Sequence, residues 1–254
     1  MHWLHALILG IVQGLTEFFP ISSSAHLKIV KDFLDIQGDT VLFDLFCHMG
    51  TFIALLIYFR NTIHDLLFRT KRRLILFIVA LIPLIPFYFL LKPIRETLSQ
   101  SQYLGFCLIG TASILFLASH FVLKAHRNLS VKDAVWIGTL QCVALIPGIS
   151  RSAATIGAGL WRGVSATEAV QFSFLLSLPA VAGGTFLELL KAKSHLAAMP
   201  ASLSNCFIGF TSSAIVGFFT VKIAIPLLQR GILRPFAWYC LIAGILISIF
   251  MHHG

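Results

Sequence analysis

The chain has 254 residues, of which 57% are hydrophobic and only 11% are charged, and its mean hydropathy is +0.89. These values exclude an ordinary soluble domain and favour a protein that lies within a membrane. The formal net charge of +9 does not indicate nucleic-acid binding, because the chain has no nucleic-acid-binding module and lipid headgroups and membrane topology account for its basic loops.

The first apolar segment, residues 3–38, is interrupted at mid-length by proline and polar residues. Gln13 and Glu17 are four residues apart and therefore share one face of a first half-helix. A carboxylate within an apolar segment is costly and indicates function, although a structural ion pair would also explain it. Because carboxylate and amide oxygens suit a hard cation, we predict that Gln13 and Glu17 bind Mg²⁺ or Ca²⁺.

A serine cluster follows the break in this segment. Pro20 ends or kinks the first half-helix, and Ser22, Ser23 and Ser24 follow at positions suited to capping a second one. Capping alone explains two of the three serines, but a helix N-terminus also attracts anions. His26 has the chemistry of a general acid or base near pH 7, although a lone histidine on a helix is more often structural.

Three apolar stretches long enough to cross a bilayer come next, near residues 41–59, 74–91 and 103–123. The densest basic run of the chain, from Arg60 to Arg73, separates the first two. By the positive-inside rule this loop is cytoplasmic. Both termini, and the face from which the segment 3–38 enters, then lie on the outer side.

Residues 133–165 repeat the first segment, with a glutamine, a proline and a serine cluster. The offset is constant, because 141−13, 150−22 and 152−24 all equal 128, about half the chain length. The second copy adds Arg151. A structural pair with Glu17 or Glu168 would explain this arginine, but its planar fork also suits a phosphate.

Three further spans are predicted near residues 170–190, 205–228 and 235–251. Each half, about 1–123 and 131–254, then has one interrupted segment and three spans, so the second half enters the membrane from the opposite face. Irregular backbone at membrane depth must be covered by protein or line a watery cavity. We therefore expect a single all-α polytopic membrane domain, residues 1–254, with six transmembrane helices and two re-entrant helix-turn-helix hairpins in an inverted-topology repeat. A crossing by one hairpin is the alternative. In such folds the site lies near the midplane, between the repeats.

Two motifs resemble those of one bacterial family. Residues 13–26, with the pattern Gln-x-x-x-Glu-x-x-Pro-x-Ser-Ser-Ser-x-His, resemble the first motif of the undecaprenyl-diphosphate phosphatase family, also called the bacitracin-resistance family. Residues 147–155 match its second motif, Pro-Gly-x-Ser-Arg-Ser-x-x-Thr, at every fixed position. The segment 172–179 also looks like a family segment, and the resemblance extends from about residue 5 to the C-terminus.

The resemblance implies hydrolysis of undecaprenyl diphosphate to undecaprenyl phosphate and inorganic phosphate, which recycles the lipid carrier of peptidoglycan synthesis. It also implies a site open to the outer face of the bacterial cytoplasmic membrane and dependence on Mg²⁺ or Ca²⁺. On matching positions, the acidic motif falls on Gln13 and Glu17, the nucleophile on Ser23, the histidine on His26 and the essential arginine on Arg151. Glutamine at position 13 leaves one carboxylate in the motif, so we expect weaker cation binding without loss of activity.

The predicted mechanism is phosphoryl transfer by positioning and charge neutralisation. Ser23 attacks the terminal phosphorus, and His26 or Glu17 takes the proton; direct attack by metal-bound water is the alternative. The predicted diphosphate contacts are Ser22, Ser24, Gly148, Ser150, Arg151, Ser152 and Thr155. The expected partners are the polyprenyl diphosphate and membrane lipids, and a homodimer is compatible with the sequence. A transporter of polyprenyl phosphate or another anion is the competing hypothesis, because inverted repeats with broken helices are typical of transporters.

Overall fold

The computed structural model of the protein describes residues 1–38, 40–68, 71–122, 126–192 and 203–252. Its elements in chain order are α1 (Trp3–Thr16), α2 (Ser23–Phe33), α3 (Val41–Phe68), α4 (Lys71–Leu81), α5 (Leu84–Leu90), α6 (Lys92–Leu98), α7 (Ser101–Phe121), α8 (Val131–Gln141), the 3₁₀ turn η2 (Cys142–Leu145), α9 (Arg151–Trp161), α10 (Ala166–Ala192), α11 (Leu203–Gln229) and α12 (Arg234–His252). Apart from one isolated bridge between Arg127 and Val164, these ranges contain no β-structure, which confirms the all-α prediction.

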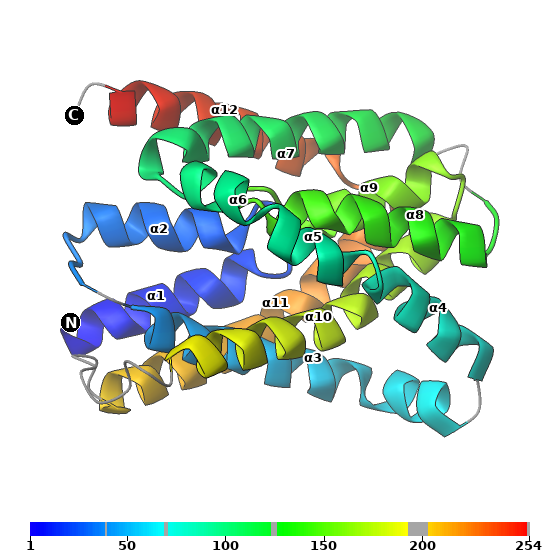
Figure 1. The fold of residues 1–254 in the computed structure, drawn as a ribbon, viewed down its shortest axis with the longest axis horizontal. Helices are drawn as coiled ribbons and strands as arrows, with labels where there is room; N and C mark the ends of the chain where they lie inside the picture. Colours follow the sequence, from blue (N-terminus) through cyan, green and yellow to red (C-terminus); the bar gives the residue numbers. More distant parts are fainter. Residues whose placement is uncertain (39, 69–70, 123–125, 193–202, 253–254) are drawn as a thin grey trace.

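Helices α1 and α2 form a hairpin that enters from the end of the molecule where the N-terminus lies (Figure 1). The turn between them contains Pro20, which has no backbone N–H for a continuing helix. It also contains Ser22, whose φ of +68° is one that residues other than glycine rarely adopt. The turn therefore places Glu17 and the serines 22–24 at the hairpin tip, near the middle of the molecule.

Helices α8 and α9 form a second hairpin that enters from the opposite end (Figure 1). η2 continues α8, and a turn through Gly148, with φ of +95°, leads to α9. Ser150 caps α9, because its hydroxyl accepts a hydrogen bond of 3.3 Å from the backbone N–H of Ala153. The two hairpin tips meet, since the backbone N–H of Gly148 donates to the hydroxyl of Ser24 at 3.3 Å.

Asp133 ties the outer ends of α8 and α9 together, far from the hairpin tips. Its fully buried carboxylate accepts hydrogen bonds from Arg127 at 2.6 Å and Arg162 at 3.1 Å, and it completes a capping box with Ser130. Burial acts to raise the pKa of Asp133, but these hydrogen bonds lower it below its ordinary value. The second hairpin is therefore fixed at its base by an ionised carboxylate.

Five helical stretches are long and apolar enough to cross a bilayer: Val41–Phe68, Arg73–Leu90, Ser101–Phe121, Ala166–Glu188 and Leu203–Gln229. They match the first five predicted spans, and the protein is a multi-pass membrane protein. The sixth predicted span, 235–251, is helical as α12, but its apolar part, Arg234–Phe250, is shorter than the other five.

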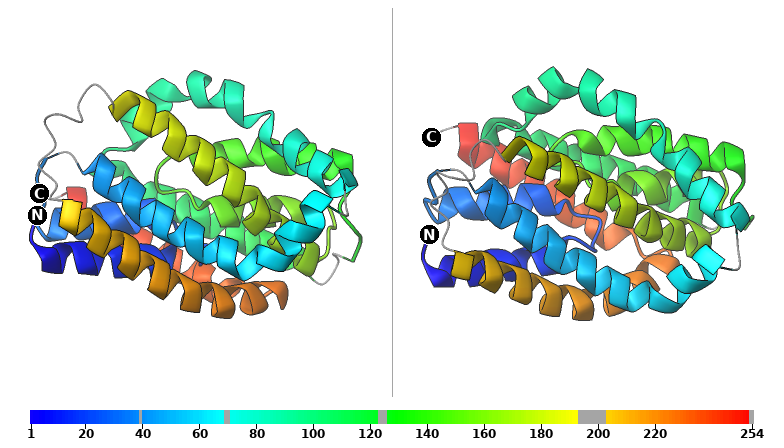
Figure 2. Two further views of the ribbon diagram at one scale, coloured as in Figure 1. Left: turned by 90° about the horizontal axis from the view of Figure 1, so that it is seen from below. Right: turned by 60° about the horizontal axis from the view of Figure 1, so that its bottom comes forward.

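The predicted span 74–91 is not one continuous helix. α4 ends at Leu81 and α5 begins at Leu84; Pro83 lies in the junction and Pro86 in the first turn of α5. The chain changes direction at this break (Figure 2). Because proline lacks a backbone N–H and its ring clashes with the preceding turn, the two residues interrupt the helical hydrogen bonding. A short helix, α6, then precedes α7.

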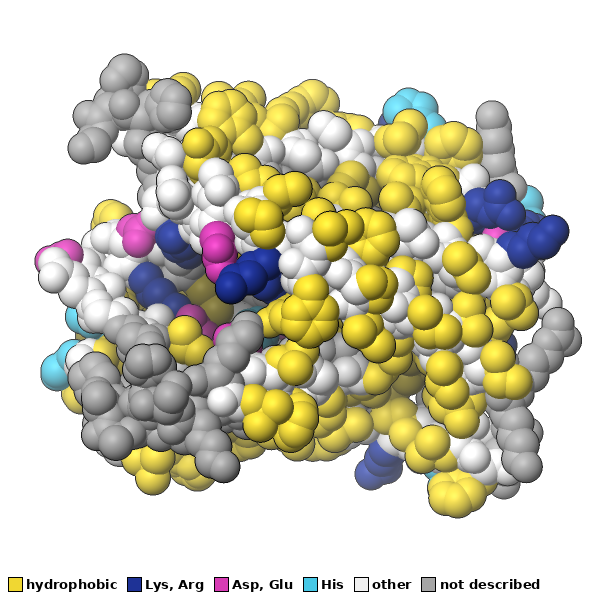
Figure 3. All heavy atoms as spheres, viewed as in Figure 1, with side chains coloured by type: hydrophobic (Ala, Val, Ile, Leu, Met, Phe, Trp, Pro, Cys, Tyr) yellow, Lys and Arg dark blue, Asp and Glu magenta, His cyan; other side chains and the backbone are white. Residues whose placement is uncertain are grey.

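Small residues allow the long helices to approach closely. A Cβ atom on Gly50 of α3 would lie 2.3 Å from the carbonyl oxygen of Phe210 on α11, and one on Gly105 of α7 would lie 2.6 Å from that of Gly244 on α12. Such contacts replace the hydrophobic driving force that lipid cannot supply. Apolar side chains cover much of the outer surface, as Figure 3 shows for one face.

Candidate active site

A cavity of about 240 Å³ lies between the two hairpin tips. The first hairpin contributes Glu17, Ser22, Ser23 and Ser24 to its lining, and the second contributes Gln141, Ser150, Arg151 and Ser152. Helix α3 adds His48, and the apolar part of the lining includes Leu84, Leu145 and Val181. Two segments 128 residues apart in the sequence therefore form one partly polar, partly apolar site.

Glu17 lies at the centre of the polar part, and its side chain is 9% exposed. Arg151 donates to its Oε1 at 2.7 Å, and the Ser23 hydroxyl donates to its Oε2 at 2.6 Å. Gln13 donates to the same Oε2 at 3.1 Å. The structure pairs Arg151 with Glu17, whereas Glu168 pairs with Arg73 elsewhere. The Ser23 hydroxyl therefore donates to the Glu17 carboxylate, and Ser23 itself lines the cavity.

The other predicted serines lie around this centre in two similar pairs. The hydroxyls of Ser22 and Ser24 are 3.2 Å apart, as are those of Ser150 and Ser152. All four residues line the cavity. The structure thus brings the two serine clusters together at one site, as the repeat predicts.

Two features of the structure require glycine at position 148. Its φ of +95° is disfavoured by side chains, and a Cβ there would lie 2.5 Å from the Cβ of Cys107. Thr111 of α7 fixes the same turn, because its hydroxyl donates to the carbonyl of Gly148 at 3.2 Å and accepts from the N–H of Ser150 at 3.0 Å. No pattern in the sequence indicates a role for Thr111, a lone threonine in an apolar span.

Thr155 is buried one turn into α9 and is not among the residues that line the cavity. Its hydroxyl lies 2.9 Å from the carbonyl of Arg151 and 2.6 Å from the hydroxyl of Ser173 on α10. This position connects the first turn of α9 to α10 and does not face a ligand directly.

His26 is turned away from the cavity lining. Its Nδ1 lies 2.8 Å from the carbonyl oxygen of Ser22 and its Nε2 lies 2.7 Å from the hydroxyl of Tyr239 on α12, against which the ring stacks. A carbonyl accepts only, so Nδ1 carries the proton and Nε2 accepts from the tyrosine. This arrangement ties His26 to α12, and its predicted role in proton transfer stays a prediction.

His48 is the histidine that lines the cavity. Its Nδ1 lies 2.8 Å from Nε2 of Gln13 and 3.7 Å from Oε2 of Glu17. Sequence reasoning missed it, although an ionisable side chain within the apolar span 41–59 is itself a signal of function. Only the approach of α3 to the first hairpin shows that it joins Gln13 and Glu17.

Several buried polar atoms around the cavity have no hydrogen-bond partner in the described part of the chain. They are Oε1 of Gln13, Nη1 of Arg151, and both Nε2 and Oε1 of Gln141. Buried polar groups are rarely left unpaired in a folded protein. These atoms therefore indicate a polar ligand in the cavity.

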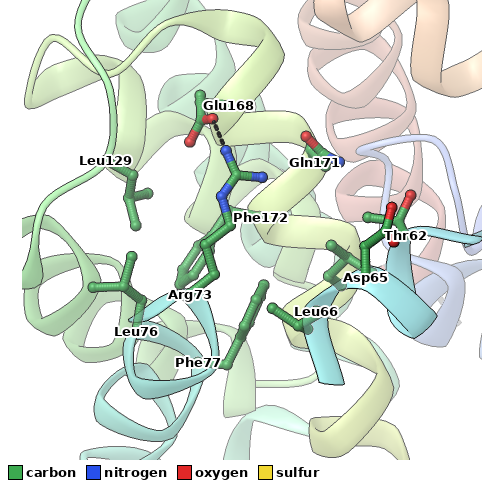
Figure 4. Close-up of a pocket in the computed structure, with 11 residues that line it drawn as sticks. Thr62, Asp65, Leu66, Arg73, Leu76, Phe77, Leu129, Glu168, Gln171 and Phe172 are labelled. Atoms are coloured by element: carbon green, nitrogen blue, oxygen red, sulfur yellow. Dashed lines mark hydrogen bonds and ion pairs between the residues drawn. The ribbon is translucent and has the colours of Figure 1, made fainter. Parts of the chain in front are cut away.

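A larger cavity, of about 500 Å³, lies at the other end of α3, where α4 and α10 begin (Figure 4). There Arg73 and Glu168 form an ion pair of 2.7 Å, and Phe77 stacks on Phe172. The ion pair of Arg73 and Glu168 joins α4 to α10, and no serine lines this cavity. The candidate active site is therefore the smaller cavity. Among the described residues there is no cluster of three or more His, Cys, Asp or Glu side chains suited to a metal.

Long apolar helices around a buried, charged cavity define a multi-pass membrane protein with a polar site inside its helical bundle. The chain belongs to the bacitracin resistance protein BacA family, whose model matches residues 6–246. This confirms the family inferred from the two motifs.

Full-length relatives carry the name undecaprenyl-diphosphatase. The protein of Protochlamydia amoebophila is 39% identical over 96% of this chain and 97% of the relative. That of Halothermothrix orenii is 37% identical over 98% of both chains, and that of Geobacter sulfurreducens is 40% identical over 96% of both. The chain therefore corresponds to these proteins along its whole length.

Proposed function

We propose that this protein is an undecaprenyl-diphosphatase, which hydrolyses undecaprenyl diphosphate to undecaprenyl phosphate and inorganic phosphate. The full-length relatives of that name support the activity. The observation that carries the proposal is the contact of 2.6 Å between the Ser23 hydroxyl and Glu17, whose other oxygen is held by Arg151 at 2.7 Å. A nucleophile, a base and a cation thus meet in one cavity.

In the reaction, Ser23 Oγ attacks the terminal phosphorus while Glu17 takes the hydroxyl proton. The bond from that phosphorus to the bridging oxygen breaks, and undecaprenyl phosphate leaves with the electron pair. Water then hydrolyses the phosphoserine and releases inorganic phosphate. Arg151 stabilises the negative charge that develops on the diphosphate as this bond breaks. In the alternative route, water attacks the phosphorus directly and Ser23 only positions it.

A divalent cation, Mg²⁺ or Ca²⁺, fits the residues present. Among the described residues the Gln13 Oε1 atom is buried without a partner, whereas Nε2 of the same amide faces Glu17 and His48. With the amide turned so that Oε1 faces Glu17, Gln13 and Glu17 would hold the ion through oxygen, and the nearby His48 would offer a nitrogen. When bound, the cation supplies further neutralisation of the diphosphate charge.

We place the protein in the bacterial cytoplasmic membrane, with α12 as the sixth span, the two hairpins re-entrant in an inverted repeat, and the site open to the outer face. The opposite entry of the hairpins and the basic run near residues 60–73 support this topology. A third cavity, of about 340 Å³, supports a site that opens to the outer face, because Ser24 and His48 line both this cavity and the catalytic one. It lies at the end of the bundle opposite that basic run, and Figure 3 shows charged side chains around a hollow at this end.

The test is phosphate release from undecaprenyl diphosphate by the purified protein in detergent. Wild type should release phosphate, and Ser23→Ala should not if the serine is the nucleophile; a trapped phosphoserine would identify the covalent route. Retained activity in Ser23→Ala would favour direct attack by water. A protein that binds undecaprenyl phosphate but releases no phosphate from the diphosphate would refute the enzyme and favour a transporter.

A further inference from the structure

We propose that Gln141 and the free arm of Arg151 form a second phosphate subsite, which holds the phosphate that remains attached to the lipid. The inference rests on the proposed diphosphatase function. It assigns a binding role to a residue that neither the serine chemistry nor the candidate cation site uses.

Gln141, the last residue of α8, is 2% exposed and lines the catalytic cavity. Neither Nε2 nor Oε1 of its amide has a hydrogen-bond partner among the residues that the structure describes. The residue at the equivalent place in the first hairpin is different, because Nε2 of Gln13 lies close to acceptors on Glu17 and His48. A buried amide with two unpaired atoms is costly and is best explained by a ligand that pairs with it.

Arg151 supplies the second half of the subsite. Its Nη2 donates to Glu17 at 2.7 Å, but its Nη1 is buried and has no partner in the described ranges of the chain. A guanidinium fork can bind two oxygens at once, so one arm remains for a ligand while the other holds Glu17. An unpaired cationic donor and an unpaired amide donor on the wall of one cavity suit an anionic oxygen ligand such as a phosphate.

The apolar lining indicates which phosphate this is. Ala144 and Leu145, three and four residues after Gln141, line the cavity, as does Leu84 of α5. Ser23, which meets the terminal phosphate, belongs to the other hairpin. A diphosphate with its lipid tail against this apolar wall has its lipid-side phosphate near Gln141 and its terminal phosphate near Ser23. The amide also offers an acceptor, Oε1, which suits a phosphate that carries a proton.

Phosphate release from undecaprenyl diphosphate and binding of undecaprenyl phosphate test the subsite in Gln141→Leu. A hydrogen bond to a charged group corresponds to about ten- to one-hundredfold in affinity, so kcat/KM should fall by that factor, mainly through KM. Binding of undecaprenyl phosphate should weaken similarly. The thermal midpoint should not fall, because leucine removes an unpaired buried amide. The matched control, Gln171→Leu, alters a glutamine of the other cavity and should leave both measurements unchanged.

A kcat/KM and a product affinity within twofold of wild type in Gln141→Leu would overturn the subsite. If that variant loses stability as well as activity, Gln141→Glu decides, because it keeps the shape of the side chain but repels a phosphate. A folded Gln141→Glu protein with normal product binding would then overturn the inference. Wild-type protein that binds undecaprenyl phosphate through Gln141 but releases no phosphate would refute the proposed function and leave the subsite standing.

Discussion

Removal of the Arg151 guanidinium tests both the stability and the chemistry of the site. The Arg151→Ala variant removes the positively charged partner of Glu17, whose side chain is 9% exposed. Breaking a buried ion pair costs roughly 3–5 kcal/mol, and since Arg151 is 23% exposed we expect the lower end of that range, about 3 kcal/mol. For a domain of this size such a loss lowers the thermal midpoint by roughly 6–12 °C.

The effect of the same change on turnover should be larger. Loss of a donor that stabilises developing charge lowers kcat by about 10²- to 10³-fold. Arg151→Lys keeps the charge but loses the fork, so its kcat should lie between those of wild type and Arg151→Ala. Adding Glu17→Gln to Arg151→Ala should restore part of the stability, since no unpaired carboxylate remains, but none of the activity.

Phosphate release and thermal denaturation in the same detergent separate the two effects. Assays run well below the lowered midpoint measure a folded Arg151→Ala protein. Turnover within about threefold of wild type under these conditions would refute the role of Arg151 in charge stabilisation. A double variant no more stable than Arg151→Ala would refute the contribution of the ion pair to stability.

Three further predictions concern the cation, the second hairpin and the histidines. EDTA should stop phosphate release and Mg²⁺ or Ca²⁺ should restore it, whereas turnover indifferent to the chelator would remove the cation from the reaction. Gly148→Ala should lose about 2–4 kcal/mol of stability in thermal denaturation, because φ at this position is positive and the added Cβ would lie against Cys107. The control is Gly183→Ala, which should lose none, because its added Cβ would meet no described atom within 4 Å. His48→Ala should lower kcat/KM about tenfold, and Tyr239→Phe, which removes a partner of His26, should change it less than threefold; the reverse order would make His26 the histidine of the site.

The sequence predicted the features that depend on local pattern. Spans follow from unbroken apolar stretches, and the two hairpin tips follow from proline and serine at constant spacing. Pro83 and Pro86 also indicate the break between α4 and α5, but the apolar length of residues 74–91 led to the prediction of one continuous span. Hydropathy averages over a window and does not report where a proline interrupts hydrogen bonding.

Features that depend on contacts between distant helices could not be predicted. Arg151 had two candidate carboxylates, Glu17 and Glu168, and only the packing of the hairpins selects the first. In the same way, nothing local to α3 shows that His48 points at Gln13. Side-chain direction depends on helix rotation, and helix rotation is set by close contacts such as that between Gly50 and α11.

The differences between the two repeats follow from the charge of the substrate. The offset of 128 places Leu145 opposite Glu17, Arg151 opposite Ser23 and Ala154 opposite His26. A second carboxylate at position 145 would lie on the cavity wall and repel a diphosphate bound there, whereas leucine adds apolar surface to that wall. An arginine in place of a second serine neutralises both Glu17 and the anion. A site with two identical hairpin tips would have two carboxylates and no fixed positive charge. To bind a diphosphate between the repeats, the second tip therefore needs an apolar residue in place of the carboxylate and an arginine in place of the serine.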